Sequence, residues 1–263
     1  MIKICLTCGT SYQQQDIQID HCKICEDERQ YVPASGQEWI SPEALHAAHS
    51  NKWYQLEKGL FSLQTVPEFA IDQRTLLVKG SQGNVLWDCI PNLDDATIDI
   101  VRALGGISAI AISHPHYYST MQDWAAAFDA PIYLHASDSE WIVRDSPYLR
   151  LWEGDAKTLM PDVTLLRLGG HFEGGTVLHW AKDDGILLSG DIVQVTAGAK
   201  AVSFMWSYPN MLPLPAAKIS DIVARLQPFH FEKLYGAFEG RDIMADAKNV
   251  VMQSAQKYID CLR

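Results

Sequence analysis

Short apolar runs, some alternating and some continuous, follow one another from residue 59 onward and predict a chain rich in β-strands. Glycine-containing turns separate them, and the second half repeats the layout of the first. Strands are predicted at residues 59–66, 75–79, 85–89, 107–112, 131–134, 163–168, 176–180, 186–189 and 233–235. Apolar spacing of helical period predicts helices at residues 94–104, 120–128, 137–143, up to 226 and from about 241.

Hairpins mixed with strand–helix units predict an α/β sandwich, in which helices cover the sheets. Before these strands, Ser41-Pro42-Glu43 has the residues of a helix start: an N-cap, a proline in the first turn and an acidic side chain. We therefore expect a connector helix within residues 41–58. This divides the chain into a small unit at residues 1–40, the connector, and a main domain at residues 59–263.

Four of the six cysteines form two CxxC pairs, Cys5 with Cys8 and Cys22 with Cys25. Two intervening residues let one tight turn direct both sulfurs at one ion, and two such pairs are typical of a tetrahedral zinc site. Gly9, directly after the first pair, suits a turn that needs positive φ. We predict a structural zinc ribbon in residues 1–40.

The net charge of the chain limits the classes of partner that it is expected to bind. The chain of 263 residues has a formal net charge of −11, and the first 40 residues contain three basic and six acidic side chains. This balance opposes binding to nucleic acid or to an anionic membrane. No apolar run approaches the ~20 residues of a membrane span, and the N-terminal residues lack the apolar core of a signal peptide. We expect a cytoplasmic protein with a small-molecule substrate and a possible protein partner at the ribbon.

Three of the nine histidines stand where predicted strands end. His114 and His116 follow the strand at 107–112, one residue apart. His171 lies in a glycine-rich turn between two strands, and Asp191 ends another strand within Leu-Ser-Gly-Asp. Imidazoles and a carboxylate delivered from separate strand ends form a suitable first shell for zinc, iron or manganese.

The order HxH, GGH with a trailing GG, and LSGD resembles the motifs of the metallo-β-lactamase superfamily over about residues 59–240. The resemblance implies an αββα sandwich. It matches Asp88 to the family's first motif, residues 114–119 to HxHxDH, His171 to the third motif and Asp191 to the metal-bridging aspartate.

The positions that depart from the family pattern all concern the second metal. The ligands specific to the second metal are replaced by Tyr118, Ser119 and, at the fifth histidine, Ala237 or Phe238. The resemblance therefore implies one metal, held by His114, His116, His171 and Asp191.

A single cation of this kind activates water and polarises a carbonyl oxygen. The sequence thus predicts hydrolysis of a small ester, thioester or amide by a metal-bound hydroxide, similar to the glyoxalase-like branch of the family. Asp191 would complete the metal's shell, or orient the water and accept its proton. Tyr118 would donate a hydrogen bond to the oxyanion or plug the position of the second metal, and Asp88 would hold the loop or a ligand histidine from behind. A lid of Trp206, Tyr208 and Met211 is an open possibility. Two alternatives remain: a mononuclear iron oxygenase acting on a thiol or persulfide, and a non-catalytic metal-binding interaction module.

Overall fold

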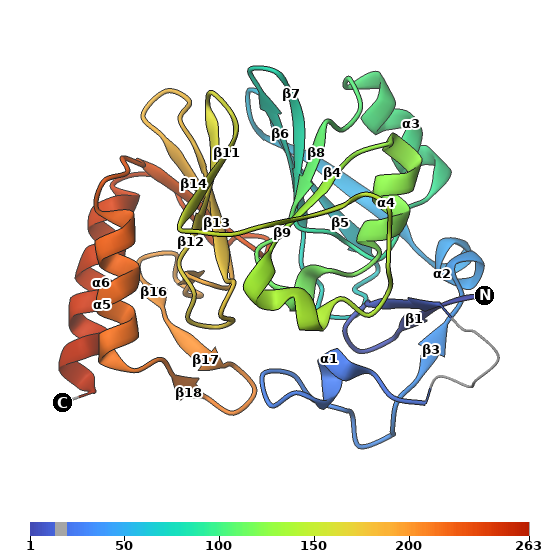
Figure 1. The fold of residues 1–263 in the computed structure, drawn as a ribbon, viewed down its shortest axis with the longest axis horizontal. Coiled ribbons are helices and arrows are strands. Elements are labelled where there is room, and N and C mark those ends of the chain that lie inside the picture. Colours follow the sequence, from blue (N-terminus) through green and yellow to red (C-terminus); the bar gives the residue numbers. More distant parts are fainter. Residues whose placement is uncertain (14–19, 263) are drawn as a thin grey trace.

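Two β-sheets face each other in the computed structural model, and helices cover the outer face of each (Figure 1). The structure describes residues 1–13 and 20–262. The small N-terminal unit lies at one end of the two sheets, beside the loops that join the strands there. The expected αββα sandwich is confirmed.

The first sheet has seven strands in the order β10-β9-β8-β7-β6-β5-β4. They are β4 (Ser50–Glu57), β5 (Leu60–Val66), β6 (Thr75–Gly80), β7 (Gly83–Trp87), β8 (Ala109–Ala111), β9 (Ile132–His135) and β10 (Leu149–Trp152). Strands β4 to β7 pair antiparallel, and β7 to β10 pair parallel. Helices α3 (Asp95–Ala103) and α4 (Met121–Phe128) pack on the outer face through Val101 and Trp124.

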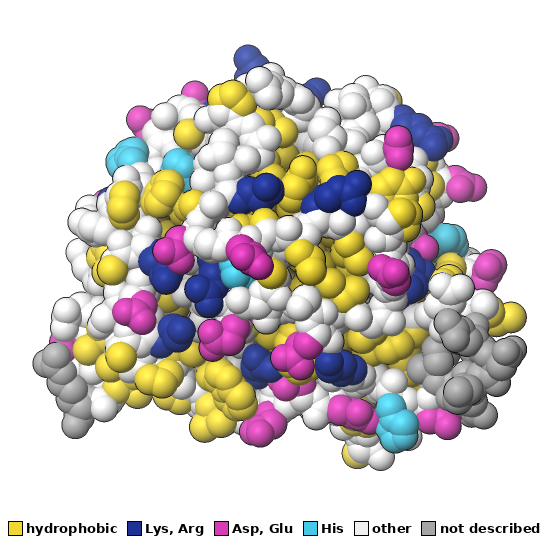
Figure 2. All heavy atoms as spheres, in the orientation of Figure 1, with side chains coloured by type: hydrophobic (Ala, Val, Ile, Leu, Met, Phe, Trp, Pro, Cys, Tyr) yellow, Lys and Arg dark blue, Asp and Glu magenta, His cyan; other side chains and the backbone are white. Residues whose placement is uncertain are grey.

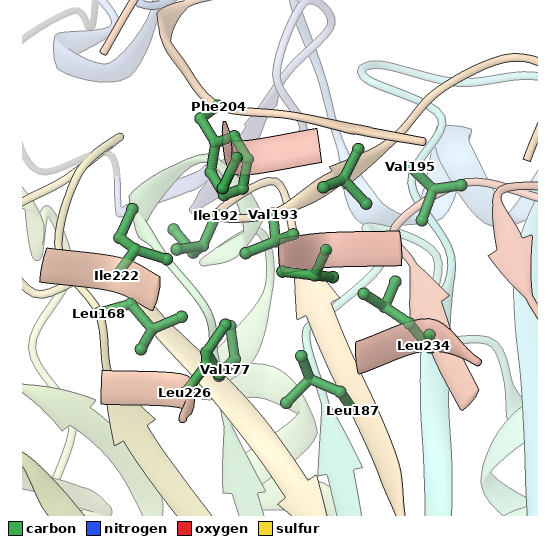
Figure 3. Packing of buried hydrophobic residues seen from close by; sticks show 14 of the residues in the cluster. Leu168, Val177, Leu187, Ile192, Val193, Val195, Phe204, Ile222, Leu226 and Leu234 are labelled. Carbon is green, nitrogen blue, oxygen red and sulfur yellow. The ribbon is translucent and has the colours of Figure 1, made fainter. Parts of the chain in front are cut away.

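The second sheet has six strands in the order β11-β12-β13-β14-β19-β20. They are β11 (Ala156–Met160), β12 (Val163–Arg167), β13 (Thr176–Trp180), β14 (Ile186–Gly190), β19 (Lys233–Gly236) and β20 (Asp242–Ile243). Helices α5 (Ala216–Leu226) and α6 (Ala247–Cys261) cover it. Figure 3 shows this packing, with Val177, Leu187 and Leu234 of three strands near Ile222 and Leu226 of α5.

The continuous apolar runs arise because central strands are buried on both faces. In β6, Leu76 and Val78 pack between the two sheets, whereas Leu77 packs under the outer helices. In β14, Leu188 faces the other sheet and Leu187 faces α5. Successive side chains of a strand point to opposite faces, so burial of both faces removes the polar alternation.

The N-terminal unit, called the cysteine module below, comprises the described residues of 1–40. It contains the sheet β2-β1-β3 and one short helix: β1 (Ile2–Cys5), β2 (Ser11–Gln13), α1 (Lys23–Glu26) and β3 (Trp39–Ile40). Helix α2 (Pro42–Ala48) follows, capped by Ser41, whose Oγ accepts a hydrogen bond from the backbone N of Ala44 at 3.2 Å.

The remaining elements are short and lie in loops. They are η1 (Pro115–Tyr117), η2 (Ala136–Trp141), β15 (Gln194–Val195), β16 (Val202–Ser203), β17 (Met205–Ser207) and β18 (Leu212–Pro213).

Several segments differ from the elements predicted. The helix expected at the connector ends at Ala48, and Ser50–Glu57 forms β4, whose largely polar residues suit the exposed edge of a sheet. Residues 136–141 form a 3₁₀ turn in place of an α-helix. The C-terminal helix begins at Ala247, because residues 242–243 pair with β19. Strands β10 and β11 were not anticipated. The unit boundaries at residues 40 and 58 stay a prediction.

Among the helices that the structure describes, none has the length and apolar character needed to cross a membrane.

The two sheets are joined at one end by Arg74, whose side chain is 1% exposed. Its Nε and Nη2 donate to the carbonyl oxygen of Gly236 in β19, at 3.0 and 2.8 Å, and its guanidinium pairs with Asp242 in β20. These contacts connect the residue before β6 in the first sheet to the last two strands of the second.

Replacing this guanidinium should destabilise the fold. Arg74→Met leaves a buried carbonyl and a largely buried carboxylate without their donor, and we expect the free energy of unfolding to fall by about 3 kcal/mol. Urea unfolding measures it. The matched control is Lys79→Met, an exposed residue of β6, with an expected change below about 0.5 kcal/mol. Equal losses in the two variants would contradict this role of Arg74.

Candidate metal centre

Three buried histidines converge where the two sheets meet. His114 follows β8, His116 lies in η1, and His171 lies in the turn between β12 and β13. One ligand atom from each lies within 4.8 Å of the other two, and the side chains are between 0 and 4% exposed. The ring centroids are 5.0 Å apart in every pair. The structure therefore brings together the three imidazoles that the sequence singled out.

Hydrogen bonds behind the rings orient two of them. The Nδ1 of His171 lies 2.7 Å from the backbone carbonyl of Trp206, so it donates there and leaves Nε2 unprotonated. The Nδ1 of His114 lies 2.8 Å from the Ser113 hydroxyl, which leaves its Nε2 facing the centre. The His116 Nδ1 is 3.3 Å from the His171 Nε2. Backbone and hydroxyl acceptors that fix the tautomer in this way are characteristic of metal-ligating histidines.

Asp88 supports His114 through Ser113. Its Oδ1 accepts hydrogen bonds from the Ser113 backbone N at 2.7 Å and from the Ser113 hydroxyl at 2.8 Å. The hydroxyl proton is thereby committed to Asp88, and the oxygen is free to accept from the His114 Nδ1. Burial raises the pKa of Asp88 to about 7. Sequence reasoning identified Asp88 but missed Ser113, the residue that connects it to the ligand.

Asp191 approaches the centre from the end of β14. Its Oδ2 lies 4.0 Å from the His114 Nε2. Gly190, with φ of +52°, makes the approach possible, because a Cβ there would lie 2.4 Å from the Ser113 Oγ. Burial raises the pKa of Asp191 to about 6, against the opposing effect of the nearby Tyr117 hydroxyl.

The turn that carries His171 needs its glycines for the same reason. Gly170 has φ of +92°, and a Cβ there would lie 2.8 Å from a methyl group of Leu214. On the other side of the histidine, the backbone N of Gly174 donates to Asp138 Oδ1 at 2.7 Å. The turn is thus held from both flanks.

Tyr118 packs in the core beside the metal centre. Its hydroxyl donates to the backbone carbonyl of Asp138, at 3.5 Å, and its ring belongs to the core under α4. Successive residues of a 3₁₀ turn point in directions about 120° apart, so the preceding Tyr117 faces the metal centre instead. The Tyr117 ring lies 4.4 Å from that of His114, and its hydroxyl lies near Asp191. Tyr117, and not Tyr118, therefore lies beside His114 and Asp191.

The positions of the missing second-metal ligands are filled by buried groups. Tyr118 and Ala237 are 3 and 4% exposed and pack in the same apolar cluster. Ser119 is 1% exposed and hydrogen-bonds to the cysteine module. Phe238 packs against the cluster from its rim.

The donor set fits a divalent cation. Within the described residues, the buried Nε2 atoms of His114 and His116 have no hydrogen-bond partner. Burial lowers the pKa of both imidazoles well below the usual range and that of His171 to about 4, which keeps all three in the neutral, metal-binding form. A buried carboxylate beside them is stabilised by a positive ion. Three nitrogens and one oxygen suit zinc, iron or manganese.

The four cysteines form a second cluster of metal-binding groups. Cys5, Cys8, Cys22 and Cys25 are at most 1% exposed, and their sulfurs lie within 4.8 Å of one another. The Sγ atoms of Cys5 and Cys25 are 3.6 Å apart, and those of Cys8 and Cys22 are 3.5 Å apart. A tetrahedral zinc with bonds of about 2.3 Å separates its sulfurs by about 3.8 Å. Gly9 has the expected positive φ, +79°.

Donors to the sulfurs come from outside the CxxC pairs. The Gln37 Nε2 lies 3.0 Å from the Cys5 Sγ, and the Tyr12 hydroxyl donates to the Cys22 Sγ at 3.4 Å. Such donors stabilise thiolates, the form that binds metal.

The predicted lid is only partly formed by the residues named for it. The Trp206 carbonyl holds His171, and the Tyr208 hydroxyl donates to the Asp191 carbonyl at 3.0 Å. Met211 is 81% exposed and does not cover the centre. Arg29, from the cysteine module, reaches the site and was missed: its Nη1 donates to the carbonyl of His171 at 3.1 Å. No local pattern connects residues 142 positions apart.

Comparison with known proteins identifies the family. The family model described as the metallo-beta-lactamase superfamily matches residues 72–229. The chain is 47% identical over 264 residues to the "Uncharacterized protein YmaE" of Bacillus subtilis (strain 168), covering 98% of this chain and 96% of that protein.

Solved structures agree on the fold. The structure of VMB-1 covers 81% of this chain and 99% of its own, with a TM-score of 0.60 at 12% identity. A B3 metallo-beta-lactamase with an active-site glutamic acid covers 90% of this chain and 97% of its own, with a TM-score of 0.56 at 14% identity. The chain therefore belongs to the metallo-β-lactamase superfamily and has its mixed α/β fold, with a four-cysteine cluster near the N-terminus.

Proposed function

We propose that this protein is a metal-dependent hydrolase of a small ester, thioester or amide, with one catalytic metal held by His114, His116, His171 and Asp191. One observation supports this most strongly. Three neutral, buried imidazoles converge within 4.8 Å, beside a carboxylate 4.0 Å from one of them.

The chain's own groups have distinct tasks in this proposal. A bound divalent ion would polarise the substrate carbonyl and lower the pKa of water. Asp191 would orient the attacking water and accept its proton. The Tyr117 hydroxyl, which lies near Asp191, would donate to the oxygen on which negative charge develops. Asp88 and Ser113 would hold His114 in its metal-binding tautomer.

We propose a single metal because the residues at the positions of a second metal make other contacts. Tyr118 and Ala237 are part of the hydrophobic core, and Ser119 is engaged with the cysteine module. A serine, a tyrosine directed at a backbone carbonyl and an alanine offer no strong ligands to zinc. With one metal, stabilising both the attacking and the leaving oxygen of a phosphodiester is harder, which favours acyl substrates.

The expected surroundings of the site are part of the same proposal. Figure 2 shows acidic and basic side chains mixed over one face of the molecule, which favours a small-molecule substrate over nucleic acid or a membrane. Four thiols available for a metal favour a reducing compartment such as the cytoplasm, with zinc as the structural ion. A protein partner at the cysteine module stays a prediction.

Metal analysis tests the two clusters. We expect about two metal ions per chain in the purified protein, and one fewer in His114→Ala/His116→Ala, because one imidazole and one carboxylate bind a divalent ion weakly. Elemental analysis of the protein measures both. His179→Ala is the matched control: His179 is partly buried in β13, with its Nε2 on the His230 carbonyl at 2.7 Å, and should keep both ions.

The identity of the metal separates the alternatives. Zinc or manganese at the histidines supports the hydrolase. Iron at the histidines, together with oxygen uptake in the presence of a thiol or persulfide, would support an oxygenase instead. Metal only at the cysteines of the wild-type chain would support a non-catalytic binding module.

Two neighbouring tyrosines offer a test of the catalytic assignment. Tyr117→Phe removes the hydroxyl beside Asp191, and we expect kcat/KM to fall by about 10- to 100-fold on a responsive ester or thioester. Tyr118→Phe removes a hydroxyl with a single long hydrogen bond, and the expected loss is smaller than about threefold. Steady-state rates of both variants on an aryl-ester and thioester panel measure this. A larger loss in Tyr118→Phe would return the role to that residue.

A further inference from the structure

The cysteine module lies directly against the histidine centre, and each of its two CxxC pairs is followed within four residues by a contact to that centre. This arrangement is visible as the meeting of the N-terminal unit with the loops below the two sheets (Figure 1). The contacts are hydrogen bonds, made by the buried Ser11 and Ser119 and by the partly buried Arg29.

The first CxxC pair leads to Ser119. The backbone N and the hydroxyl of Ser11, three residues after Cys8, donate to the carbonyl of Ser119 at 3.0 and 3.1 Å. The Ser119 hydroxyl donates in return to the carbonyl of Gly9 at 3.3 Å. In the family motif, the position of Ser119 carries a histidine that binds the second metal. In this chain the residue at that position hydrogen-bonds to the cysteine module instead.

The second CxxC pair leads to His171. Arg29, four residues after Cys25, donates from Nη1 to the carbonyl of His171 at 3.1 Å, and its guanidinium stacks 3.8 Å from the ring centre of Phe172. Asp27 holds the other edge of this guanidinium through Nε and Nη2, at 2.6 and 3.0 Å. The planar fork of arginine therefore joins the module to the backbone of a metal ligand.

The same segment also holds the loop behind His171. The carbonyl of Glu28 accepts from the Ser207 hydroxyl and from the Asn210 Nδ2, both at 2.7 Å. Both residues follow Trp206 in the chain, and the Trp206 carbonyl fixes the His171 Nδ1. Residues 27–29 thus secure both the backbone of the ligand and the group that sets its tautomer.

The cysteines make up most of the central core of the module. Four of the five buried residues in this cluster are cysteines, and Ile24 is the fifth. A second cluster packs Ile4 on Leu45 and Phe69 outside the module. A bound ion would therefore order the segments around the cysteines. Loss of that ion would release the segments that carry Ser11 and Arg29.

From these contacts we infer that the cysteine module is a supporting wall of the histidine centre and that metal binding at the two clusters is coupled. Metal at the four cysteines raises the metal affinity of the histidines, with Arg29 as the positioning residue that transmits the effect. Linkage makes the coupling reciprocal, so metal at the histidines strengthens binding at the cysteines by the same factor. The inference rests on the metal site of the proposed function but not on the reaction catalysed there.

Cobalt(II) binding to the full chain tests the coupling. Cobalt at thiolates gives a charge-transfer band that cobalt at imidazoles lacks, so one titration against a competing chelator reports both clusters. In Cys5→Ser/Cys8→Ser, we expect the dissociation constant at the histidines to rise about 10- to 100-fold, the usual effect of removing outer-shell support. Cys261→Ser, an exposed cysteine of α6, is the control and should change it less than about twofold.

A second variant leaves the cysteines intact. Arg29→Lys keeps the positive charge but loses the fork, and we expect about a 10-fold weaker histidine site with the cysteine site loaded. The control is Arg150→Lys on β10, an exposed arginine whose Nη1 also donates to backbone carbonyls, at 2.8 and 2.7 Å. An Arg29→Lys protein with wild-type affinity would show that Arg29 acts through charge alone and would overturn its positioning role.

Reciprocity gives a third measurement, which does not depend on the folding of the cysteine variant. His114→Ala/His116→Ala should weaken cobalt binding at the cysteines by the factor seen in the opposite direction. The coupling would be overturned if two results came together: cobalt bound the cysteines of His114→Ala/His116→Ala as tightly as in the wild type, and it bound the histidines of Arg29→Lys as tightly as in the wild type. Absence of cobalt at the histidines of the wild-type chain would overturn the proposed function as well, so the two failures are distinguishable.

Discussion

Three imidazoles are buried side by side, and the loss of water around them is the constraint on which the rest of the site depends. Burial keeps His114, His116 and His171 neutral, with ring nitrogens aimed at one point. Buried polar atoms are costly unless they are paired. A cation at this point would satisfy the nitrogens and the Asp191 carboxylate together, and the surrounding hydrogen bonds prepare the ligands for it. Ser113, the Trp206 carbonyl and Gly190 are arranged to that end.

The site is built at one edge of the sandwich, where strands from both sheets end. β7 and β8 deliver Asp88 and His114 from the first sheet, while the β12–β13 turn and the end of β14 deliver His171 and Asp191 from the second. A hydrogen bond of 2.9 Å from the Thr176 backbone N to the Ser113 carbonyl joins the two sets. Packing of the sheets therefore sets the metal-site geometry directly.

The positions that the family resemblance assigns to a second metal make other contacts in this structure. Tyr118 and Ala237 contribute to the core, Phe238 packs against it, and Ser119 hydrogen-bonds to the cysteine module. These residues therefore take part in packing or in holding the module against the main domain.

Local signals determined much of this protein. CxxC spacing identified the four cysteines, strand-end histidines identified the three imidazoles, and the Ser41 cap and the central apolar strands were predictable because short-range geometry and burial dictate them. The polar edge strand β4, the choice of Tyr117 over Tyr118, and the reach of Arg29 to His171 were decided only by the tertiary structure. An edge strand gains its pairing from a neighbour, a side chain's direction depends on the turn that carries it, and a contact across 142 residues exists only after both sheets have packed.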